Sequence, residues 1–185
     1  MRKLVAVELV SLDGVIESPE EWAFPYSNDE MNEANAEGMA TSDALLLGRE
    51  TYEQMAAFWP EQPGGMPMVD YINSVRKYVV STALEEAGWN NSTLIKDNVA
   101  EEIAQLKRHP GKNITTLGSA VLVRSLLRAG LLDELRLTVH PVVLGSGKRL
   151  FEDGGDRESM ELVSSRTFGT GVLDLTYRPS GERSS

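Results

Sequence analysis

Three segments of the sequence place a glycine or a hydroxyl residue where a short apolar run ends, a pattern typical of phosphate binding. In the first, Gly48, Arg49 and Thr51 follow the apolar residues 44–47. Glycine lets a ligand approach the backbone, arginine donates paired hydrogen bonds to phosphate, and a helix N-terminus offers free N–H groups. A capped helix beside a solvated arginine would show the same residues, so both interpretations remain open for this segment alone.

The other two segments repeat this chemistry. Gly118, Ser119 and Ala120 follow the strand-like residues 114–117 and could hold a pyrophosphate, although the GxGxxG fingerprint is absent. Ser81 ends another strand-like run, where its hydroxyl could bind phosphate or ribose or could simply cap the strand end. Because open α/β sheets bind ligands at the carboxyl ends of their strands, the three segments together predict an extended anion site.

Two further residues could contact a substrate. Asp13 lies on the turn Ser11-Leu12-Asp13-Gly14 after the first strand, where it could contact substrate or could serve only the Asp-Gly turn. Trp22 could line a substrate pocket or pack beneath a loop. The sequence favours neither interpretation for either residue.

Composition argues against several other functions. The chain has 185 residues, no cysteine and only two histidines, so we expect no disulfide, no thiolate chemistry and no catalytic metal. The net charge of −10 argues against nucleic acid and anionic membranes as partners. The segment Gly145-Ser146-Gly147-Lys148 fails as a P-loop, because Val142 stands where the first glycine is required. We expect a cytoplasmic protein.

The elements that position these residues alternate between strands and helices. Strands are predicted at residues 3–10, 44–47, 78–81, 93–95 and 114–117. Helices are predicted from a capping box of Ser27 and Glu30 to residue 39, at 51–57, after Asn98 and after Ser119. Residues 160–168 and 172–178 flank Gly169-Thr170-Gly171 as a hairpin. The pattern predicts one α/β domain, residues 1–178, whose mainly parallel sheet ends in antiparallel strands, followed by a disordered tail at 179–185.

Taken in order, the segments resemble the dihydrofolate-reductase-like superfamily. They are most similar to stand-alone relatives of the C-terminal reductase domain of the bifunctional riboflavin-biosynthesis deaminase-reductase. The resemblance runs from about residue 3 to 177 and depends on these motifs: Ser11-Leu12-Asp13-Gly14, Leu46-Leu47-Gly48-Arg49 with Thr51-Tyr52-Glu53, Val79-Val80-Ser81, Gly118-Ser119, and His140-Pro141-Val142-Val143-Leu144-Gly145-Ser146-Gly147 with Leu150-Phe151.

The resemblance implies a three-layer α/β fold with a central, mostly parallel sheet of about eight strands and helices on both faces. It implies NADPH as cofactor and, often, a homodimer. Gly48, Arg49 and Thr51 would hold the adenosine-side phosphates, Ser81 would lie near the 2′-phosphate, and Gly118, Ser119 and Ala120 would hold the pyrophosphate. Asp13 and Trp22 would lie beside the substrate.

Two departures from the family limit which residue roles can be carried over to this sequence. No deaminase half is present, and without cysteine its zinc site could not exist here. The first helix offers Asp29, Glu30 and Glu33, but none can be matched to the substrate-facing acid of dihydrofolate reductases.

Two hypotheses about function follow from the motifs and the resemblance. One is an NADPH-dependent reductase of a small planar heterocycle, such as a pterin or a ribosylaminopyrimidine, in which Asp13 or water supplies the proton. The other is a nucleotide-binding protein without turnover.

Overall fold

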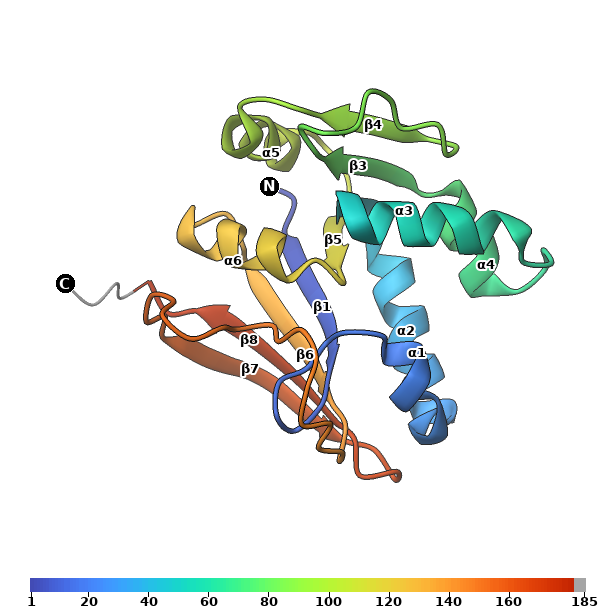
Figure 1. Ribbon diagram of the computed structural model, residues 1–185, viewed down its shortest axis with the longest axis vertical. Coiled ribbons are helices and arrows are strands. Elements are labelled where there is room, and N and C mark those ends of the chain that lie inside the picture. The colour runs from blue at the N-terminus through green and yellow to red at the C-terminus, as the bar shows by residue number, and fades with distance from the viewer. Residues whose placement is uncertain (182–185) are drawn as a thin grey trace.

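Eight strands form one sheet, in the order β4-β3-β2-β5-β1-β6-β8-β7 (Figure 1). The computed structural model describes residues 1–181. The strands are β1 (Leu4–Val10), β2 (Ser42–Gly48), β3 (Arg76–Val80), β4 (Ser92–Ile95), β5 (Asn113–Leu117), β6 (Glu134–Val139), β7 (Met160–Thr167) and β8 (Leu173–Pro179). All pairs among β1 to β6 are parallel, whereas β8 pairs antiparallel with β6 and β7. The predicted mainly parallel sheet with an antiparallel C-terminal hairpin is therefore confirmed.

Helices cover both faces of this sheet, as Figure 1 shows. They are α1 (Pro19–Trp22), α2 (Asp29–Thr41), α3 (Arg49–Phe58), α4 (Pro67–Ser74), α5 (Val99–Arg108) and α6 (Ala120–Arg128), with 3₁₀ turns at Phe24–Tyr26 and Trp59–Glu61. Side chains alternate along β2: Ala44 and Leu46 pack towards α5 and α6, whereas Leu45 and Leu47 pack towards α3 and α4. Because both faces of β2 are covered, its sequence is apolar without interruption.

Helix starts differ from the prediction at three places. The side chain of Asn28, not Ser27, caps α2 by accepting a hydrogen bond from Met31 N at 3.0 Å. Helix α3 begins at Arg49 rather than Thr51. Asn98 makes no side-chain cap before α5, because it takes a left-handed conformation with φ of 49° as the chain enters the helix. Helix α4 was not expected from the sequence.

A buried lysine ties the connection between β3 and β4. Lys77 is fully buried, and its Nζ donates hydrogen bonds to Val75 O at 2.9 Å and to Asn90 O at 3.1 Å. The same ammonium lies 4.1 Å from the ring centroid of Trp89. Burial lowers the pKa of Lys77 to about 8. These contacts tie the chain before β4 to the amino-terminal end of β3.

Within residues 1–181, no helix is long and apolar enough to cross a membrane. The tail expected at residues 179–185 falls largely outside the part of the chain that the structure describes.

Candidate functional site

The turns that follow β2 and β5 meet at the carboxyl edge of the sheet. The two strands pair in parallel, so Gly48 and Leu117 end at the same edge. The Ser119 hydroxyl accepts a hydrogen bond from Gly48 N at 3.0 Å and bonds to Thr51 Oγ1 at 3.0 Å. Gly48, Thr51 and Ser119, which were predicted to serve one ligand, are thus brought into direct contact, and the N-termini of α3 and α6 lie side by side.

Neither of these two helices is capped by a side chain. The first backbone N–H groups of a helix have no partner within the helix and carry a partial positive charge. In helix α2 the side chain of Asn28 satisfies one of these groups. Gly48, which precedes α3, has no side chain to do so, and the Ser119 hydroxyl does not cap α6. Two uncapped N-termini side by side form an electropositive position suited to an anion.

Close approach of the two turns requires glycine on each side. A Cβ at Gly48 would lie 2.9 Å from Ser119 Oγ, and a Cβ at Gly118 would lie 3.1 Å from Thr51 Cγ2. Gly118 also has a φ of +69°, which a residue with a side chain adopts only at a cost. The glycines that the sequence pattern selected are therefore needed for packing as well as for any ligand.

Arg49 and Ser81 extend this edge towards β3. Arg49 is the first residue of α3; its side chain is half exposed, and its Nη1 donates to Glu53 Oε2 at 3.1 Å. Ser81 follows β3, and its hydroxyl accepts hydrogen bonds from Ala83 N at 3.1 Å and Leu84 N at 3.2 Å. The hydroxyl of Ser81 thus caps the turn after β3, the plainer of the two interpretations offered for it.

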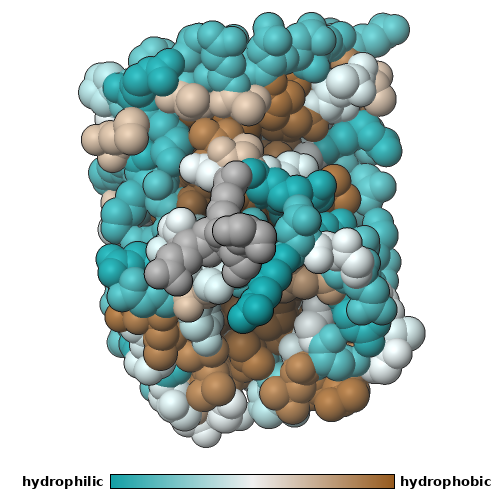
Figure 2. Space-filling model, turned by 90° about the vertical axis from the view of Figure 1, so that its left-hand side faces the viewer, coloured by the Kyte–Doolittle hydropathy of each residue, from teal (hydrophilic) through white to brown (hydrophobic). Residues whose placement is uncertain are grey.

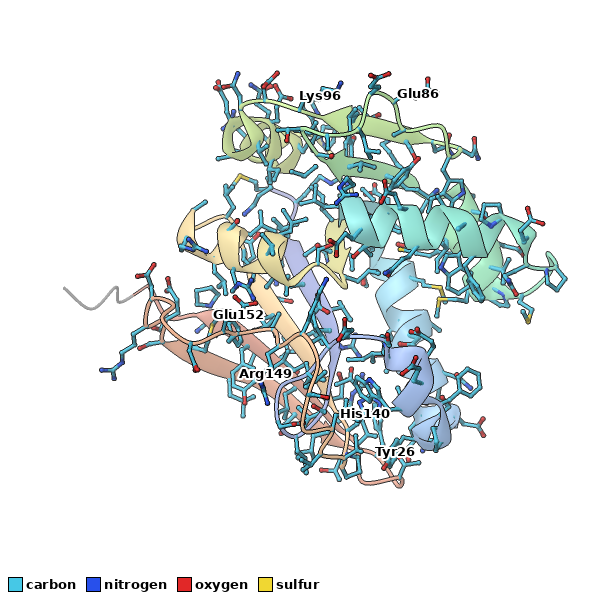
Figure 3. The ribbon with its side chains drawn as sticks, viewed as in Figure 1. Tyr26, Glu86, Lys96, His140, Arg149 and Glu152 are labelled. Atoms are coloured by element: carbon cyan, nitrogen blue, oxygen red, sulfur yellow. The ribbon has the colours of Figure 1, made fainter. Side chains whose placement is uncertain are left out.

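Lys96 is a cation at this edge that sequence reasoning missed. It directly follows Ile95, the last residue of β4. The carbonyl oxygen of Ile95 accepts a hydrogen bond from Ser81 N at 3.1 Å. Its side chain is exposed (Figure 3). The available signal was a basic residue at the end of a strand-like run, the same signal that selected Arg49.

Asp13 joins two loops that lie far apart in the sequence. Its carboxylate accepts hydrogen bonds from Ser11 Oγ at 2.6 Å, Gly145 N at 2.8 Å and Leu144 N at 3.2 Å. These bonds lower the pKa of Asp13 to about 2, the Ser11 hydroxyl making the largest contribution. A carboxylate that is ionised at neutral pH has no proton to donate, so the geometry argues against Asp13 as the proton donor and makes it a fixed acceptor.

The loop from residue 142 to residue 150 packs against residues 11–17 along its whole length. Backbone hydrogen bonds join Leu12 N to Val142 O, Ile16 N to Lys148 O and Leu150 N to Gly14 O. Gly147 has a φ of +120°, and a Cβ there would lie 2.7 Å from Val15 Cγ1. The segment rejected as a P-loop is therefore a tight turn fitted against the Asp13 turn.

Trp22 and His140 pack together beneath these loops. His140 is fully buried, and its Nδ1 lies 2.9 Å from Thr138 O. Its ring meets Trp22 and Tyr26 edge-on, with centroids 5.2 Å and 5.7 Å apart, and Figure 3 shows His140 beside Tyr26. Burial lowers the pKa of His140, so the ring is neutral at neutral pH.

Trp22 also borders a hollow. Its Nε1 donates to Glu17 O at 2.9 Å, and its ring forms part of the wall of a cavity of about 330 Å³ together with Glu17, Leu144 and Gly147. Trp22 therefore packs beneath a loop and also borders a cavity, and its contact with a substrate stays a prediction. A second cavity of about 410 Å³, beside Asp43 and Asn91, lies at the opposite, amino-terminal edge of the sheet.

Glu8 is a second residue at this edge that the sequence did not single out. It lies in β1 and is only 3% exposed, and its Oε2 accepts a hydrogen bond from Gly118 N at 3.1 Å. Burial raises the pKa of Glu8 to about 8. The signal in the sequence was an acid inside an otherwise apolar strand.

Two of the four acids of α2 are engaged with the C-terminal hairpin. Glu30 Oε1 accepts a hydrogen bond from Gly169 N at 2.8 Å, and Glu37 Oε2 accepts one from Arg166 Nη2 at 3.2 Å. No group of His, Cys, Asp and Glu side chains within residues 1–181 is arranged to hold a metal ion. The polar groups of the carboxyl edge are backbone amides, hydroxyls and Arg49, all of which can donate hydrogen bonds. Such groups suit an anionic organic ligand.

Fold and edge together define an α/β protein of the class that binds its ligand at the carboxyl ends of parallel strands. The chain matches the model of the RibD C-terminal domain family over residues 2–173 and belongs to that family. It is 38% identical to YyaP of Bacillus subtilis over 142 residues, 75% of each chain, and 30% identical to YwjB of the same organism over 174 residues, 92% of this chain and 95% of YwjB. Both relatives are uncharacterized.

Solved structures share the fold. A pyrimidine reductase-like protein from Corynebacterium diphtheriae is similar with a TM-score of 0.69, at 14% identity, over 98% of this chain and 93% of its own. Dihydrofolate reductase from Enterococcus faecalis, complexed with NADP(H), has a TM-score of 0.62 at 19% identity over 96% of each chain. The bifunctional deaminase/reductase from Thermotoga maritima has a TM-score of 0.66 at 14% identity, over 96% of this chain but 56% of its own. The expected dihydrofolate-reductase-like fold is confirmed.

The contact between the two turns can be tested by adding one methyl group. We expect Gly118→Ala to lower the free energy of unfolding by roughly 2–4 kcal/mol, because it combines a left-handed backbone with a methyl pressed against Thr51. Gly65→Ala is the matched control, since Gly65 has a φ of +94° but nothing within 4 Å of its Cβ position. Urea unfolding measures both variants, and equal losses would show that the contact with Thr51 is unimportant.

Proposed function

We propose that the protein is a cytoplasmic NADPH-dependent reductase that transfers hydride to a C=N or C=O group of a small planar heterocycle. The observation that carries the proposal is the pair of uncapped helix N-termini joined by the Ser119 hydroxyl. Membership of the RibD C-terminal domain family supports it, as does a fold shared with a dihydrofolate reductase complexed with NADP(H). The bifunctional relative's reductase substrate, a ribosylaminopyrimidine, suggests the substrate class.

The residues at the carboxyl edge fit this cofactor. Gly118, Ser119 and Ala120 would hold the pyrophosphate on the N-terminus of α6, and Gly48 and Thr51 complete the turn beside it. Arg49 would pair with the 2′-phosphate, exchanging its present partner Glu53 for a stronger anion. When bound, the cofactor supplies the hydride, and the protein supplies position and electrostatics.

The substrate would lie between the Asp13 turn and Trp22. Asp13 is held rigidly by Ser11, Leu144 and Gly145, so it can present an ionised acceptor to a ring N–H group. Because its pKa is about 2, the proton that completes the reduction would come from water rather than from Asp13. Trp22 would offer an apolar wall to a flat ring.

Replacing Arg49 tests the assignment of the 2′-phosphate. We expect Arg49→Ala to weaken NADPH binding roughly 10- to 100-fold, because a charge-assisted hydrogen bond to phosphate is worth about 1.5–3 kcal/mol. NADH lacks that phosphate, so its binding should change little. Quenching of tryptophan fluorescence measures both ligands.

Arg76→Ala is the matched control for Arg49→Ala. Arg76 is an exposed arginine at the amino-terminal end of β3, on the opposite edge of the sheet, and its loss should leave both affinities unchanged. Equal weakening of NADPH and NADH by Arg49→Ala would remove Arg49 from the 2′-phosphate. If NADPH neither quenches the fluorescence nor raises the Tm of the wild-type protein, the cofactor assignment is wrong.

Turnover separates the reductase from its alternative, a protein that binds nucleotide without catalysis. The reductase predicts that NADPH absorbance falls when a dihydropterin or a ribosylaminopyrimidine is added, and that Gly118→Ala slows this loss. The alternative predicts NADPH binding with no oxidation by any substrate of either kind. Loss of absorbance without an added heterocycle serves as the blank.

We further propose that the protein is a homodimer formed through the C-terminal strands. The edge strand β7 is exposed along almost its whole length, and Leu162, Val163 and Leu173 expose 52%, 51% and 37% of their surface. Figure 2 views the molecule from the left-hand side of Figure 1, where β7 and β8 lie. Apolar residues gather in the lower half of this face. We expect light scattering to give twice the chain mass, and Leu162→Glu to give the monomer; a wild-type monomer at all concentrations contradicts the proposal.

A further inference from the structure

Glu8 carries a carboxyl group into the apolar interior directly beneath the turn that opens α6. Alternation along β1 places it on the same face as Ala6 and Val10, which belong to the apolar cluster packed under α6. One carboxyl oxygen, Oε2, accepts the hydrogen bond from Gly118 N at 3.1 Å. The other oxygen, Oε1, is buried and has no hydrogen-bond partner.

Within the described residues, the pKa shift of Glu8 has burial and the hydrogen bond from Gly118 N as its causes, and no cation contributes to it. Four basic side chains of α6, β6 and the loop after β6 pair with other carboxylates: Arg124 with Glu152, Lys148 with Glu50, Arg149 with Asp13, and Arg136 with Asp174 on the opposite face of the sheet. Strand β5 carries no ionisable residue from Asn113 to Leu117. A buried carboxylate without a counter-charge is costly, and desolvation accordingly raises the pKa of Glu8 to about 8. At neutral pH the group is protonated.

The position of this carboxyl ties its charge to the anion site. Gly118 N lies at the start of the turn whose following residues would hold a pyrophosphate, and Glu8 fixes the direction of that N–H bond. A neutral carboxyl does this without repelling an anion at the N-terminus of α6. An ionised carboxyl would place a negative charge in a poorly screened interior, within one residue of the ligand.

We propose that Glu8 is a positioning residue for the cofactor turn, and that the turn binds its anionic nucleotide only while Glu8 is protonated. The proposal rests on the proposed function, because it takes the α6 turn as the pyrophosphate site. It adds to that function a residue and a proton requirement that neither the motifs nor the family match supplies.

The pH dependence of NADPH binding tests this requirement. The dissociation constant of the wild-type protein should begin to rise between pH 7 and pH 8 and exceed its value at neutral pH roughly tenfold or more by about pH 9.5, as Glu8 loses its proton. Glu8→Gln keeps an acceptor for Gly118 N but cannot ionise, so its dissociation constant should stay level over the whole range. Glu8→Ala loses the hydrogen bond and should bind more weakly at every pH.

Protein stability gives a readout that needs no cofactor. The pKa of Glu8 is raised from 4.5 to about 8 on folding, so the folded protein holds this proton to higher pH than the unfolded chain. The resulting stabilisation is complete below about pH 4.5 and is lost as the pH rises to about 8, with no further loss above that value. Urea unfolding should show this slope in the wild-type protein and a shallower slope in Glu8→Gln.

Glu134→Gln is the matched control, because Glu134 is a strand carboxylate on the neighbouring β6 whose partner is Lys3, at the other edge of the sheet. It should show both wild-type pH profiles. If the wild-type protein binds NADPH and Glu8→Gln shows the same rise in dissociation constant, the inference about Glu8 is overturned while the proposed function stands. If the wild-type protein binds NADPH at no pH, the proposed function itself fails.

Discussion

The position of β5 between β1 and β2 is the constraint on which the rest of the structure depends. Because β5 pairs in parallel with both neighbours, the turns after all these strands open at one edge. The Gly118 turn then lies close enough to the Gly48 turn for the Ser119 hydroxyl to bond to it, and close enough to β1 for Glu8 to reach Gly118 N. The contact between the Gly48 and Gly118 turns, the neighbouring N-termini of α3 and α6 and the bond from Gly118 N to Glu8 all depend on this pairing.

The candidate site is a local exception to the charge of the molecule. A net charge of −10 repels anionic ligands at long range. The nucleotide proposed as ligand would therefore be attracted by short-range groups: the amides of two helix N-termini, Arg49 and Lys96.

Much of this could be predicted from the sequence, because strand ends and glycines leave local signals. The sequence pattern selected Gly48 and Gly118 because glycine lets a ligand approach the backbone. In the structure, the two glycines also let the turns themselves approach each other. Glu8 and the role of Asp13 were not predictable. Their meaning depends on partners at Gly118 and Gly145, 110 and 132 positions away, and nothing in the local sequence names those partners. Helix α2 was placed correctly, but its cap moved by one residue, because Asn and Ser are nearly equal as caps.

The position of β1 at the centre of the sheet has a consequence for how the chain reaches its native state. Strand β1 pairs with β5 and β6, which follow it by more than a hundred residues, and the Asp13 turn closes only on the loop around Gly145. Contacts of such long sequence separation form slowly, since each requires the closure of a large loop. Residues 4–10, almost entirely apolar, must wait unpaired until most of the chain has been synthesised. An unpaired apolar strand of this kind is a segment through which incompletely folded chains can aggregate.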